Sequence, residues 1–493
     1  MILTPSQMKA VEEAAFLEGA TPAELMESAG EGIARVVGQF FPRGGTIIVF
    51  CGKGHNGGDA LLAAHRLVSA GWQLFIRLVS PVEELAALTR AHLEKLPATA
   101  IIGSLPRNIT SPLILLDGLL GLGSEGHPRG MTAELIREMN DCRDQKGAFS
   151  IAIDLPSGLD GTTGEVFDPC VQTDLTVTLG MVKSGLMADR ATSVVGRLAL
   201  VPLPGISLPE ECGDRAKVIT ADLLRSSLPV RDFDSYKGTY GGIGIVAGSR
   251  GYLGAARLAS SAAVRAGGGL VTLYALPENY ELIAPLCIPE VMVKPVDSYL
   301  DALSDAHDVL AVGPGVGDAH ADDLRKIVSR ATMPCVVDAG ALNAISKEPS
   351  LLINCAASRL LTPHPGEMER LNPQKGRTRR EWAESFAEAY PVTLLLKGAR
   401  TIIAEKGRET VFNTTGNPGM GSGGMGDVLT GVCAALIGSG HHLRDAAMLG
   451  AWLCGRSAEI AISHGGESQE SLSASSVISH LGAACAALRG DDY

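Results

Sequence analysis

Residues 417–431 read Asn-Pro-Gly-Met-Gly-Ser-Gly-Gly-Met-Gly-Asp-Val-Leu-Thr-Gly. A glycine-rich loop here ends on one acid, Asp427, and the apolar residues 428–437 that follow are typical of a helix. A loop without side chains that opens a helix turns several backbone N–H groups toward one point, where the helix dipole adds partial positive charge. The stretch therefore predicts an α/β domain with an anion site, most naturally for phosphate. The glycines are Gly419, Gly421, Gly423, Gly424 and Gly426.

The carboxylate of Asp427 indicates what such a site does. A base at the mouth of a phosphate site can take the proton of a hydroxyl group that lies beside the phosphate. The simpler interpretation is a glycine-rich turn whose Asp only caps the helix, but five glycines are more than a cap needs. We therefore expect nucleotide chemistry on an alcohol.

Length and composition are those of a multidomain α/β enzyme. A chain of 493 residues is too long for one core, and 59 glycines with 19% charged residues suit many tight strand–helix turns. A net charge of −12 without a basic tract argues against nucleic acid as a partner. The ten cysteines form no CxxC pair and no cluster with zinc-ligand spacing, so we expect reduced, mostly buried thiols.

The chain shows no sign of export or membrane insertion. Glu12 and Glu13 stand where a signal peptide would be apolar, and no apolar run approaches the roughly 18 residues of a membrane helix. We expect a cytoplasmic enzyme that contacts neither membrane nor nucleic acid.

Strand-like runs alternate with helical segments in both halves, which predicts parallel, doubly wound sheets. The runs are residues 46–50, 74–79, 113–117, 150–154 and 175–179 in the first half, and 243–247, 270–275, 309–312, 335–338 and 393–396 in the second. Residues 202–235, rich in Pro and Gly, read as a linker and boundary. We expect an α/β protein with two domains, residues 1–210 and 225–493.

Polar clusters follow the strands of the first half, at the edge where such sheets bind ligands. The turn GKGHNGGD, residues 52–59, resembles a phosphate-binding turn but matches neither GxGxxG nor the P-loop, so a plain tight turn is the alternative. Asp154 precedes the rigid turn Pro-Ser-Gly, which suits a general acid/base or an Asp that caps its own turn. Asn56, Asp117 and Ser157 offer oxygen ligands for a cation, or a hydrogen-bond network without metal.

Three features of the second half accompany the glycine loop. His364 lies between two prolines, which fix the backbone around it, although a lone His is often structural. Lys397 and Thr401 follow a strand, where they can meet phosphate. The turn GPGVG, residues 313–317, lets a flat ligand approach the backbone closely.

These motifs together resemble a known family. The second half is similar to ADP-dependent NAD(P)H-hydrate dehydratases of the ribokinase-like superfamily, through GSRGYLGAA (248–256), GPGVG, DAGALN (338–343), TPHPGEM (362–368), KGART (397–401) and NPGMGSGGMGD (417–427). The first half resembles NAD(P)H-hydrate epimerases, through LMESAG (25–30), GKGHNGGD, DGLLGLG (117–123) and DLPSGLDGTTG (154–164). The resemblance covers nearly the whole chain, and the order is that of bifunctional nicotinamide-nucleotide repair enzymes.

The resemblance implies a repair activity. NADH and NADPH gain water across the nicotinamide 5,6 double bond, which gives R and S hydrates that no longer donate hydride. The first half, with a Rossmann-like doubly wound sheet, would interconvert the two hydrates. The second, with a ribokinase-like α/β domain, would dehydrate the S form at the expense of ADP or ATP with Mg²⁺. Potassium in the epimerase site and a homo-oligomer are further expectations.

The resemblance also assigns residues. Asp154 and Asp427 are the expected catalytic groups, and Asn56, Asp117 and Ser157 the expected potassium ligands. The expected epimerase contacts to the hydrate, besides Asp154, are His55, Asn56, Gly57, Gly58, Asp59, Gly121, Leu122, Gly123, Ser124, Glu125, Gly126 and His127. The expected dehydratase contacts to the hydrate are Ala255, Gly317, His364 and Asp427. The expected nucleotide contacts are Lys397, Gly398, Ala399, Arg400, Thr401, Gly423, Gly424, Met425 and Gly426.

Some positions depart from the family pattern. Met425 stands where GTGD is usual, His55 replaces a common Asn, and residues 117–123 read DGLLGLG rather than DALLGTG. None of these changes removes a side chain that the assignment needs, although His55 alters a contact to the nucleotide.

Other functions fit parts of the sequence. A small-molecule kinase of the same superfamily explains Asp427 but gives the first half no task, unless that half is a non-catalytic binding module. The retained Asp154, Asn56 and Asp117 argue against such a module. A redox dehydrogenase is disfavoured because GxGxxG with a following ribose-binding acid is absent.

Overall fold

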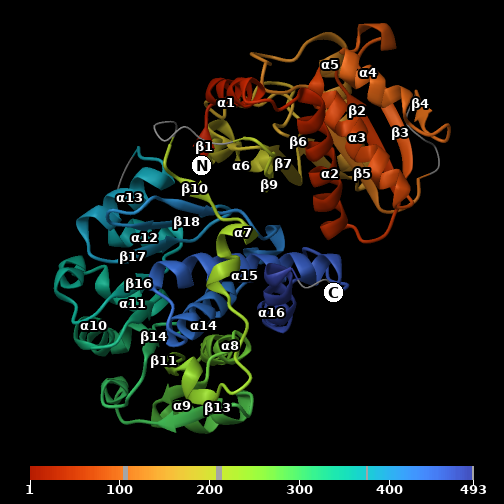
Figure 1. Ribbon diagram of the computed structural model, residues 1–493. Coiled ribbons are helices and arrows are strands. Elements are labelled where there is room, and N and C mark those ends of the chain that lie inside the picture. Colours follow the sequence, from red (N-terminus) through yellow and green to blue (C-terminus); the bar gives the residue numbers. More distant parts are fainter. Residues whose placement is uncertain (104–108, 207–213, 374–375, 491–493) are drawn as a thin grey trace. The chain divides into compact units, whose positions relative to one another are not determined.

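The chain folds into two compact units, Met1–Arg215 and Ala216–Tyr493. Figure 1 draws the computed structural model, which describes residues 1–103, 109–206, 214–373 and 376–490. Both units are α/β, with parallel sheets covered by helices, which confirms the expected fold class of two domains. Among the residues described, no helix combines the length and apolar character needed to cross a membrane.

The first unit contains short strands and six described helices. Its strands are β1 (Ile2–Leu3), β2 (Thr46–Cys51), β3 (Gln73–Leu78), β4 (Ile101–Ile102), β5 (Leu113–Gly118), β6 (Phe149–Ile153), β7 (Leu175–Leu179), β8 (Val182–Lys183) and β9 (Arg197–Val201). Its helices are α1 (Pro5–Leu17), α2 (Pro22–Phe40), α3 (His55–Ser69), α4 (Ala87–Glu94), α5 (Gly130–Lys146) and α6 (Thr192–Val195).

The described strands of this unit form a parallel sheet in the order β4-β3-β2-β5-β6-β7-β9, and β1 pairs with β8 beside it. Strand β2 is buried along its whole length because both faces are covered. Ile47 and Val49 pack toward α2 and α3, whereas Ile48 and Phe50 pack toward α5. The chain runs outward from β2 and returns to β5 on its other side, so the switch point where such sheets bind ligands lies between β2 and β5.

The second unit has a larger sheet. Its strands are β10 (Lys217–Val218), β11 (Gly242–Val246), β12 (Leu270–Ala275), β13 (Val291–Pro295), β14 (Val309–Val312), β15 (Cys335–Val337), β16 (Arg359–Leu361), β17 (Thr393–Leu396), β18 (Thr401–Glu405) and β19 (Val411–Asn413). Its helices are α7 (Ala221–Leu224), α8 (Leu253–Arg265), α9 (Pro277–Ile283), α10 (Ala321–Arg330), α11 (Ala339–Ile345), α12 (Pro365–Leu371), α13 (Arg379–Ala389), α14 (Met425–Gly438), α15 (Leu443–Ser463) and α16 (Ala474–Arg489).

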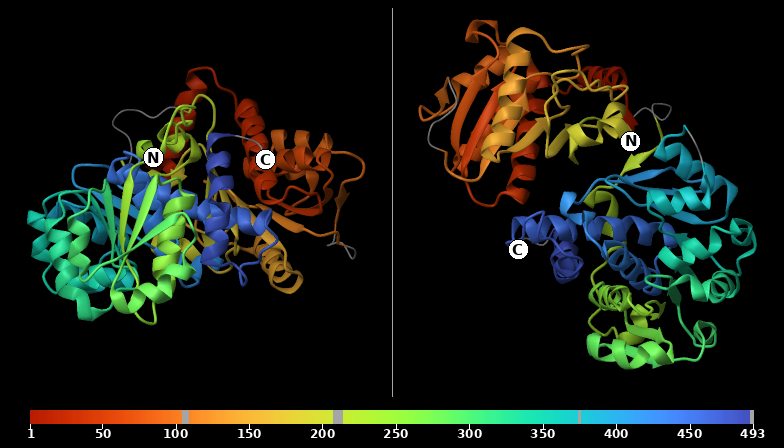
Figure 2. Two further views of the ribbon diagram at one scale, coloured as in Figure 1. Left: turned by 90° about the horizontal axis from the view of Figure 1, so that it is seen from below. Right: turned by 180° about the vertical axis from the view of Figure 1, so that it is seen from behind.

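The described strands of this sheet follow the order β10-β19-β18-β17-β16-β15-β14-β11-β12-β13. Pairing is parallel except along the antiparallel run β17-β18-β19. Helices cover both faces (Figure 2), and α8, α14, α15 and α16 share one large apolar core with the sheet. The switch point lies between β11 and β14, which the chain reaches only after β12 and β13.

Two predicted boundaries differ from the structure. Residues 202–235 are not only a linker, because β10 pairs in parallel with β19 and α7 follows it; residues 207–213 lie outside the described part. Helix α14 begins at Met425, before the apolar run 428–437, and α3 begins at His55, inside the turn 52–59. Glycine at the N-cap leaves no side-chain signal for the start of either helix.

Candidate active sites

The first site lies at the switch point of the first unit, where α3 begins. Its N-cap, Gly54, makes no side-chain cap, so the first-turn N–H groups of α3 form a ready anion site. The turn packs backbone against backbone. A Cβ on Gly52 would lie 1.9 Å from the oxygen of Leu119, and one on Gly57 would lie 2.5 Å from the oxygen of Gly52. Only glycine permits this approach.

Residues 121–127, the expected contacts that follow β5, approach the turn 52–59 at Gly121. A Cβ on Gly121 would lie 3.3 Å from Cβ of Asn56. Ser124 donates from Oγ to the oxygen of Gly121 at 2.9 Å, which closes a tight turn. Leu122 instead packs on the apolar cluster of Leu3, Met8 and Val11. Residues 123 and 125–127 are exposed, and the ring of His127 lies 5.0 Å from that of Phe167.

The structure brings the three expected potassium ligands into one network. Asp117 is fully buried and accepts hydrogen bonds from Ser157 Oγ at 2.7 Å, Ser157 N at 2.7 Å and Leu119 N at 3.2 Å. Asn56 donates from Nδ2 to the oxygen of Leu120 at 2.7 Å, and the N–H of Leu120 donates to Ser157 Oγ at 3.0 Å. Burial raises the pKa of Asp117 to about 6, although the three hydrogen bonds oppose it.

Asp154 is held by a partner that sequence analysis missed. It follows β6 with a left-handed φ of 65°, uncommon for a residue other than glycine. Its Oδ1 accepts hydrogen bonds from Leu179 N at 3.0 Å and Thr178 Oγ1 at 3.2 Å, and it forms an ion pair with Lys183. Lys183 and Asp154 are both buried.

Two more carboxyl groups surround this pair. Burial raises the pKa of Asp59 well above its ordinary value, and the charges of Asp154 and Glu12 add to the effect while Lys183 opposes it. Burial likewise raises the pKa of Glu12, with Lys183 opposing and Asp154 adding to the shift. Burial and the charges of Asp154 and Glu12 therefore disfavour the ionised form of Asp59, which lies on α3.

The second site lies at the start of α14. Gly424 is its N-cap, with φ 91°, and Asp427 is the third residue of the helix, so the acid lies inside the first turn rather than at the end of the loop. Burial raises the pKa of Asp427 to about 6; Asp338 adds to the shift and Lys397 opposes it. A carboxyl group with this pKa suits a general base near neutral pH.

Lys397 lies close to two acidic side chains of this site. Its Nζ donates to Oδ1 of Asp338 at 2.8 Å and lies 3.8 Å from Oε2 of Glu367. Asp338 also accepts from Thr430 Oγ1 on α14 at 2.9 Å. Burial alone would lower the pKa of Lys397, but the charges of Asp338, Glu367 and Asp427 raise it, so the ammonium stays charged.

His364 and the remaining nucleotide contacts adjoin this cluster. The N–H of His364 donates to Oε2 of Glu367 at 2.8 Å in a capping box at the start of α12, and the imidazole is half exposed. After β17, Gly398 and Ala399 are exposed whereas Arg400 is buried. Thr401 donates from Oγ1 to the oxygen of Gly398 at 3.2 Å.

The expected hydrate contacts Ala255, in the first turn of α8, and Gly317, after β14, belong to two segments that meet at the switch point, where the N–H of Gly248 donates to the oxygen of Pro314 at 2.8 Å. Ser249 donates from Oγ to the oxygen of Gly315 at 2.7 Å. A Cβ on Gly315 would lie 2.9 Å from Cβ of Ala255, and one on Gly317 would lie 3.8 Å from Ser249 Oγ. The turns after β11 and β14 are thus in backbone contact.

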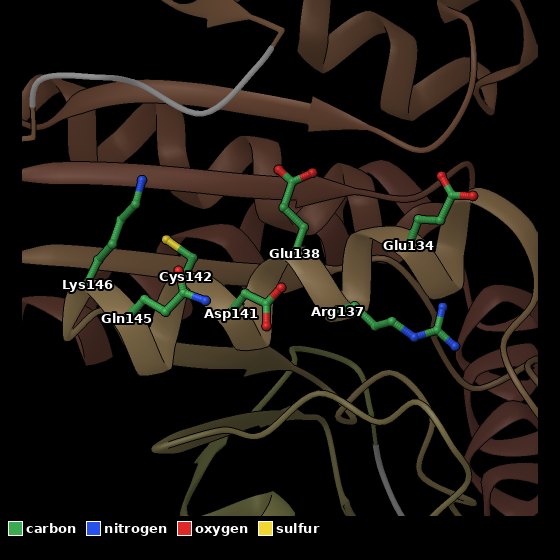
Figure 3. A pocket seen from close by; sticks show the side chains of 7 residues that line it. All are labelled: Glu134, Arg137, Glu138, Asp141, Cys142, Gln145 and Lys146. Carbon is green, nitrogen blue, oxygen red and sulfur yellow. The ribbon is translucent and has the colours of Figure 1, made fainter.

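Two surface pockets lie away from these clusters. One, of about 410 Å³, is lined by residues of α5 (Figure 3), where Glu138 pairs with Arg77 at 2.6 Å. The other, of about 500 Å³, lies between β17, β18 and the start of α15. Neither is lined by a residue expected to act in catalysis, so we assign neither to the chemistry.

Comparison with known proteins gives the family. A bifunctional NAD(P)H-hydrate repair enzyme of Moorella thermoacetica is 34% identical, over 94% of this chain and 93% of its own length. The chain belongs to this family. The repair enzyme of Escherichia coli is also 34% identical, over 91% of this chain and 87% of its own.

Family models match both halves of this repair-enzyme chain. Residues 22–185 match the YjeF-related protein N-terminus, and residues 243–480 match NAD(P)H-hydrate dehydratase. A solved ADP/ATP-dependent NAD(P)H-hydrate dehydratase of Bacillus subtilis is 28% identical, with a TM-score of 0.49, over 55% of this chain and 98% of its own.

Sequence analysis of this repair-enzyme chain gave no role to Lys183, Asp338 or Glu367. Asp338 had a usable signal, because it is the last residue of the predicted strand-like run 335–338 and directly follows β15. Glu367 stood in a quoted motif. Lys183 had no signal, since it is a lone cation after the apolar residues Met181 and Val182.

Proposed function

We propose that this chain repairs hydrated NADH and NADPH in two steps. The first unit interconverts the R and S hydrates, and the second dehydrates the S form with ADP as phosphoryl donor. The observation that carries the proposal is Asp427, a carboxyl group with a raised pKa in the first turn of α14, beside the Lys397–Asp338 pair. A base, an anion site and a cation thus converge on one point.

The chemistry of dehydration explains why a nucleotide is needed. Hydroxide is a poor leaving group in neutral water, whereas phosphate is a good one. Asp427 takes the proton of the C6 hydroxyl, whose oxygen then bonds to the terminal phosphorus of the nucleotide as the bond to the leaving AMP breaks. Loss of phosphate from C6 and of a proton from C5 restores the double bond. The amides of residues 423–426 stabilise the charge on the phosphoryl group.

The other side chains would hold the two substrates. Lys397, with residues 398–401, binds the phosphates and adenosine of the nucleotide. Ala255, Gly317 and His364 hold the hydrate. Mg²⁺ fits as a companion of the nucleotide, because it prefers phosphate oxygens and waters to an all-protein set of ligands. Bound Mg²⁺ would neutralise phosphate charge.

In the first unit Asp154 is the acid/base of epimerisation. The start of α3, residues 55–59, and the turn 121–127 hold the phosphates of the hydrate. Asp117 fits a potassium ion because its buried carboxylate has neutral hydrogen-bond donors and no cation beside it among the described residues. Asn56 and Ser157 would supply neutral oxygens, which suit a large monovalent ion. The ion would order the turn that contacts the hydrate.

One assay tests both steps. The protein is incubated with a mixture of R and S NADH hydrate, Mg²⁺ and either ADP or ATP, and the absorbance at 340 nm is followed. We expect complete recovery of NADH from both forms with ADP. Recovery of only the S fraction would contradict the epimerase assignment, and phosphorylation without recovery of NADH would make the protein a kinase. Sedimentation of the intact chain tests the expected homo-oligomer.

A further inference from the structure

The ammonium group of Lys183 lies at the centre of the first site. The side chain is 1% exposed. Besides its ion pair with Asp154, Nζ donates to the oxygen of Leu179 at 2.6 Å and lies 3.4 Å from Oγ1 of Thr178. A buried ammonium needs such compensation. The ammonium group therefore has three acceptors within the protein, and the lysine is a buried partner of Asp154 rather than a surface charge.

The surroundings of Asp154 leave one of its oxygens for a ligand. Oδ1 receives Lys183, the N–H of Leu179 and the hydroxyl of Thr178. No donor to Oδ2 occurs in the described part of the chain. The left-handed backbone at Asp154, with φ 65°, is strained for a residue other than glycine, and such strain persists where the surroundings enforce it. Fold and ion pair together orient this carboxylate.

Other charged groups reach the pair from two helices. Glu12 lies on α1 and Asp59 lies on α3. Burial raises the pKa of both carboxyl groups, and the charge of Asp154 raises both further. Lys9 acts only on Glu12. Three carboxyl groups therefore gather around one buried ammonium, and removal of that ammonium would leave Asp154 among acids alone.

We propose that Lys183 is a positioning residue for epimerisation, whose ion pair holds Oδ1 of Asp154 so that Oδ2 meets the substrate. The proposal rests on the epimerase function proposed above. Asp154 takes the proton of the C6 hydroxyl, and the C6–N1 bond breaks as the C6–O bond becomes a carbonyl, with the electron pair left on N1. N1 then bonds to the opposite face of C6, and Asp154 returns the proton to the oxygen. Lys183 keeps its own proton throughout, and no bond to Nζ forms or breaks.

Three variants of the full chain test this role. Lys183→Met removes the charge, Lys183→Arg keeps it, and Thr178→Val removes a neutral donor to the same oxygen. For each, kcat and KM of R-hydrate epimerisation are measured from pH 5 to 9. Dehydration of pure S hydrate by the same preparation is the control for the second unit, and circular dichroism with thermal unfolding is the control for the first.

We expect Lys183→Met to lower kcat by about 10²-fold or more with KM changed less than about threefold. Lys183→Arg should restore most of kcat because it keeps the ion pair, and Thr178→Val should lose less than about tenfold in kcat. If Lys183→Met does not fold, Lys183→Gln, which keeps a donor for Leu179, takes its place.

An unchanged kcat in the neutral variant overturns the proposal, and so does a loss of kcat that is matched by a loss of thermal stability and is not rescued by Lys183→Arg, because the ion pair would then only support the fold. If the unaltered protein does not epimerise at all, both the proposed function and this role are wrong. If the unaltered protein epimerises and the neutral variant matches it, only the role of Lys183 is wrong.

Discussion

Lys397 and Asp338 form an ion pair of 2.8 Å between Nζ and Oδ1, although 59 residues separate them. They follow β17 and β15, which lie on either side of β16. The other oxygen of Asp338 accepts from Thr430 on α14. Asp338 therefore ties the nucleotide lysine to the helix that carries Asp427, and it adds to the burial that raises the pKa of Asp427.

Asp427→Asn should lower dehydration of S hydrate by roughly 10²–10⁴-fold, the usual effect of a lost general base. Nucleotide binding should survive, because the amides of the loop remain. Rates come from absorbance at 340 nm and binding from calorimetry. Epimerisation by the same preparation is the internal control, and a near-normal dehydration rate in the variant would contradict the assignment.

The pH profile of dehydration should report Asp427. Its pKa is raised to about 6, and the base acts only when ionised. The rate should therefore fall about tenfold for each pH unit below 6 and level off above it. Because Lys397 opposes the shift, Lys397→Met should move this limb to higher pH as well as weaken nucleotide binding. A limb that stays at the same pH in that variant would show that another group titrates.

Gly424→Ala should destabilise the second unit by about 1–2 kcal/mol, since φ is 91° there and an L-residue is strained in that region. The added Cβ would also lie 2.5 Å from Leu258 Cδ1 and 3.1 Å from Ala474 Cβ. Gly423→Ala is the matched control, because its Cβ would meet nothing within 4 Å. Thermal unfolding of both variants measures the difference, and equal unfolding temperatures would refute the steric argument.

Potassium should support epimerisation more than sodium does. A titration of the epimerase rate with each salt at constant ionic strength is the measurement. Asp117→Ala should remove the dependence and raise KM for the hydrate, whereas Asp154→Ala should abolish the rate but keep potassium-induced stabilisation against heat. A rate indifferent to potassium in the unaltered protein would reduce Asn56, Asp117 and Ser157 to a hydrogen-bond network.

The two halves should act separately when cut at the right place. A fragment of residues 216–493 should dehydrate S hydrate and leave R hydrate to its slow uncatalysed epimerisation. A fragment of residues 225–493 lacks β10 and all of α7, which belong to the second unit, and should unfold at a lower temperature. Equal consumption of R and S by the longer fragment would show that the epimerase does not reside in the first half.

Local patterns predicted much of the fold. The runs 175–179, 270–275, 309–312 and 393–396 are strands with the same bounds, because a buried parallel strand reads as a continuous apolar run between turns. The helix starts were less accessible. His55 and Met425 each begin a helix. The glycine N-caps that precede them carry no side chain from which the start of the helix could be predicted.

The sequence by itself determined three features: the alternation of strands and helices, the glycine turns that approach other backbones, and the placing of Asp154 and Asp427 beside such turns. All three depend on residues that are neighbours along the chain. Only the tertiary structure decided which distant charges meet them. Lys183 reaches Asp154 from 29 residues away, and Asp338 reaches Lys397 from 59. The order of strands in a sheet sets these pairs, and no local periodicity encodes that order, because crossovers and switch points depend on packing across the whole domain.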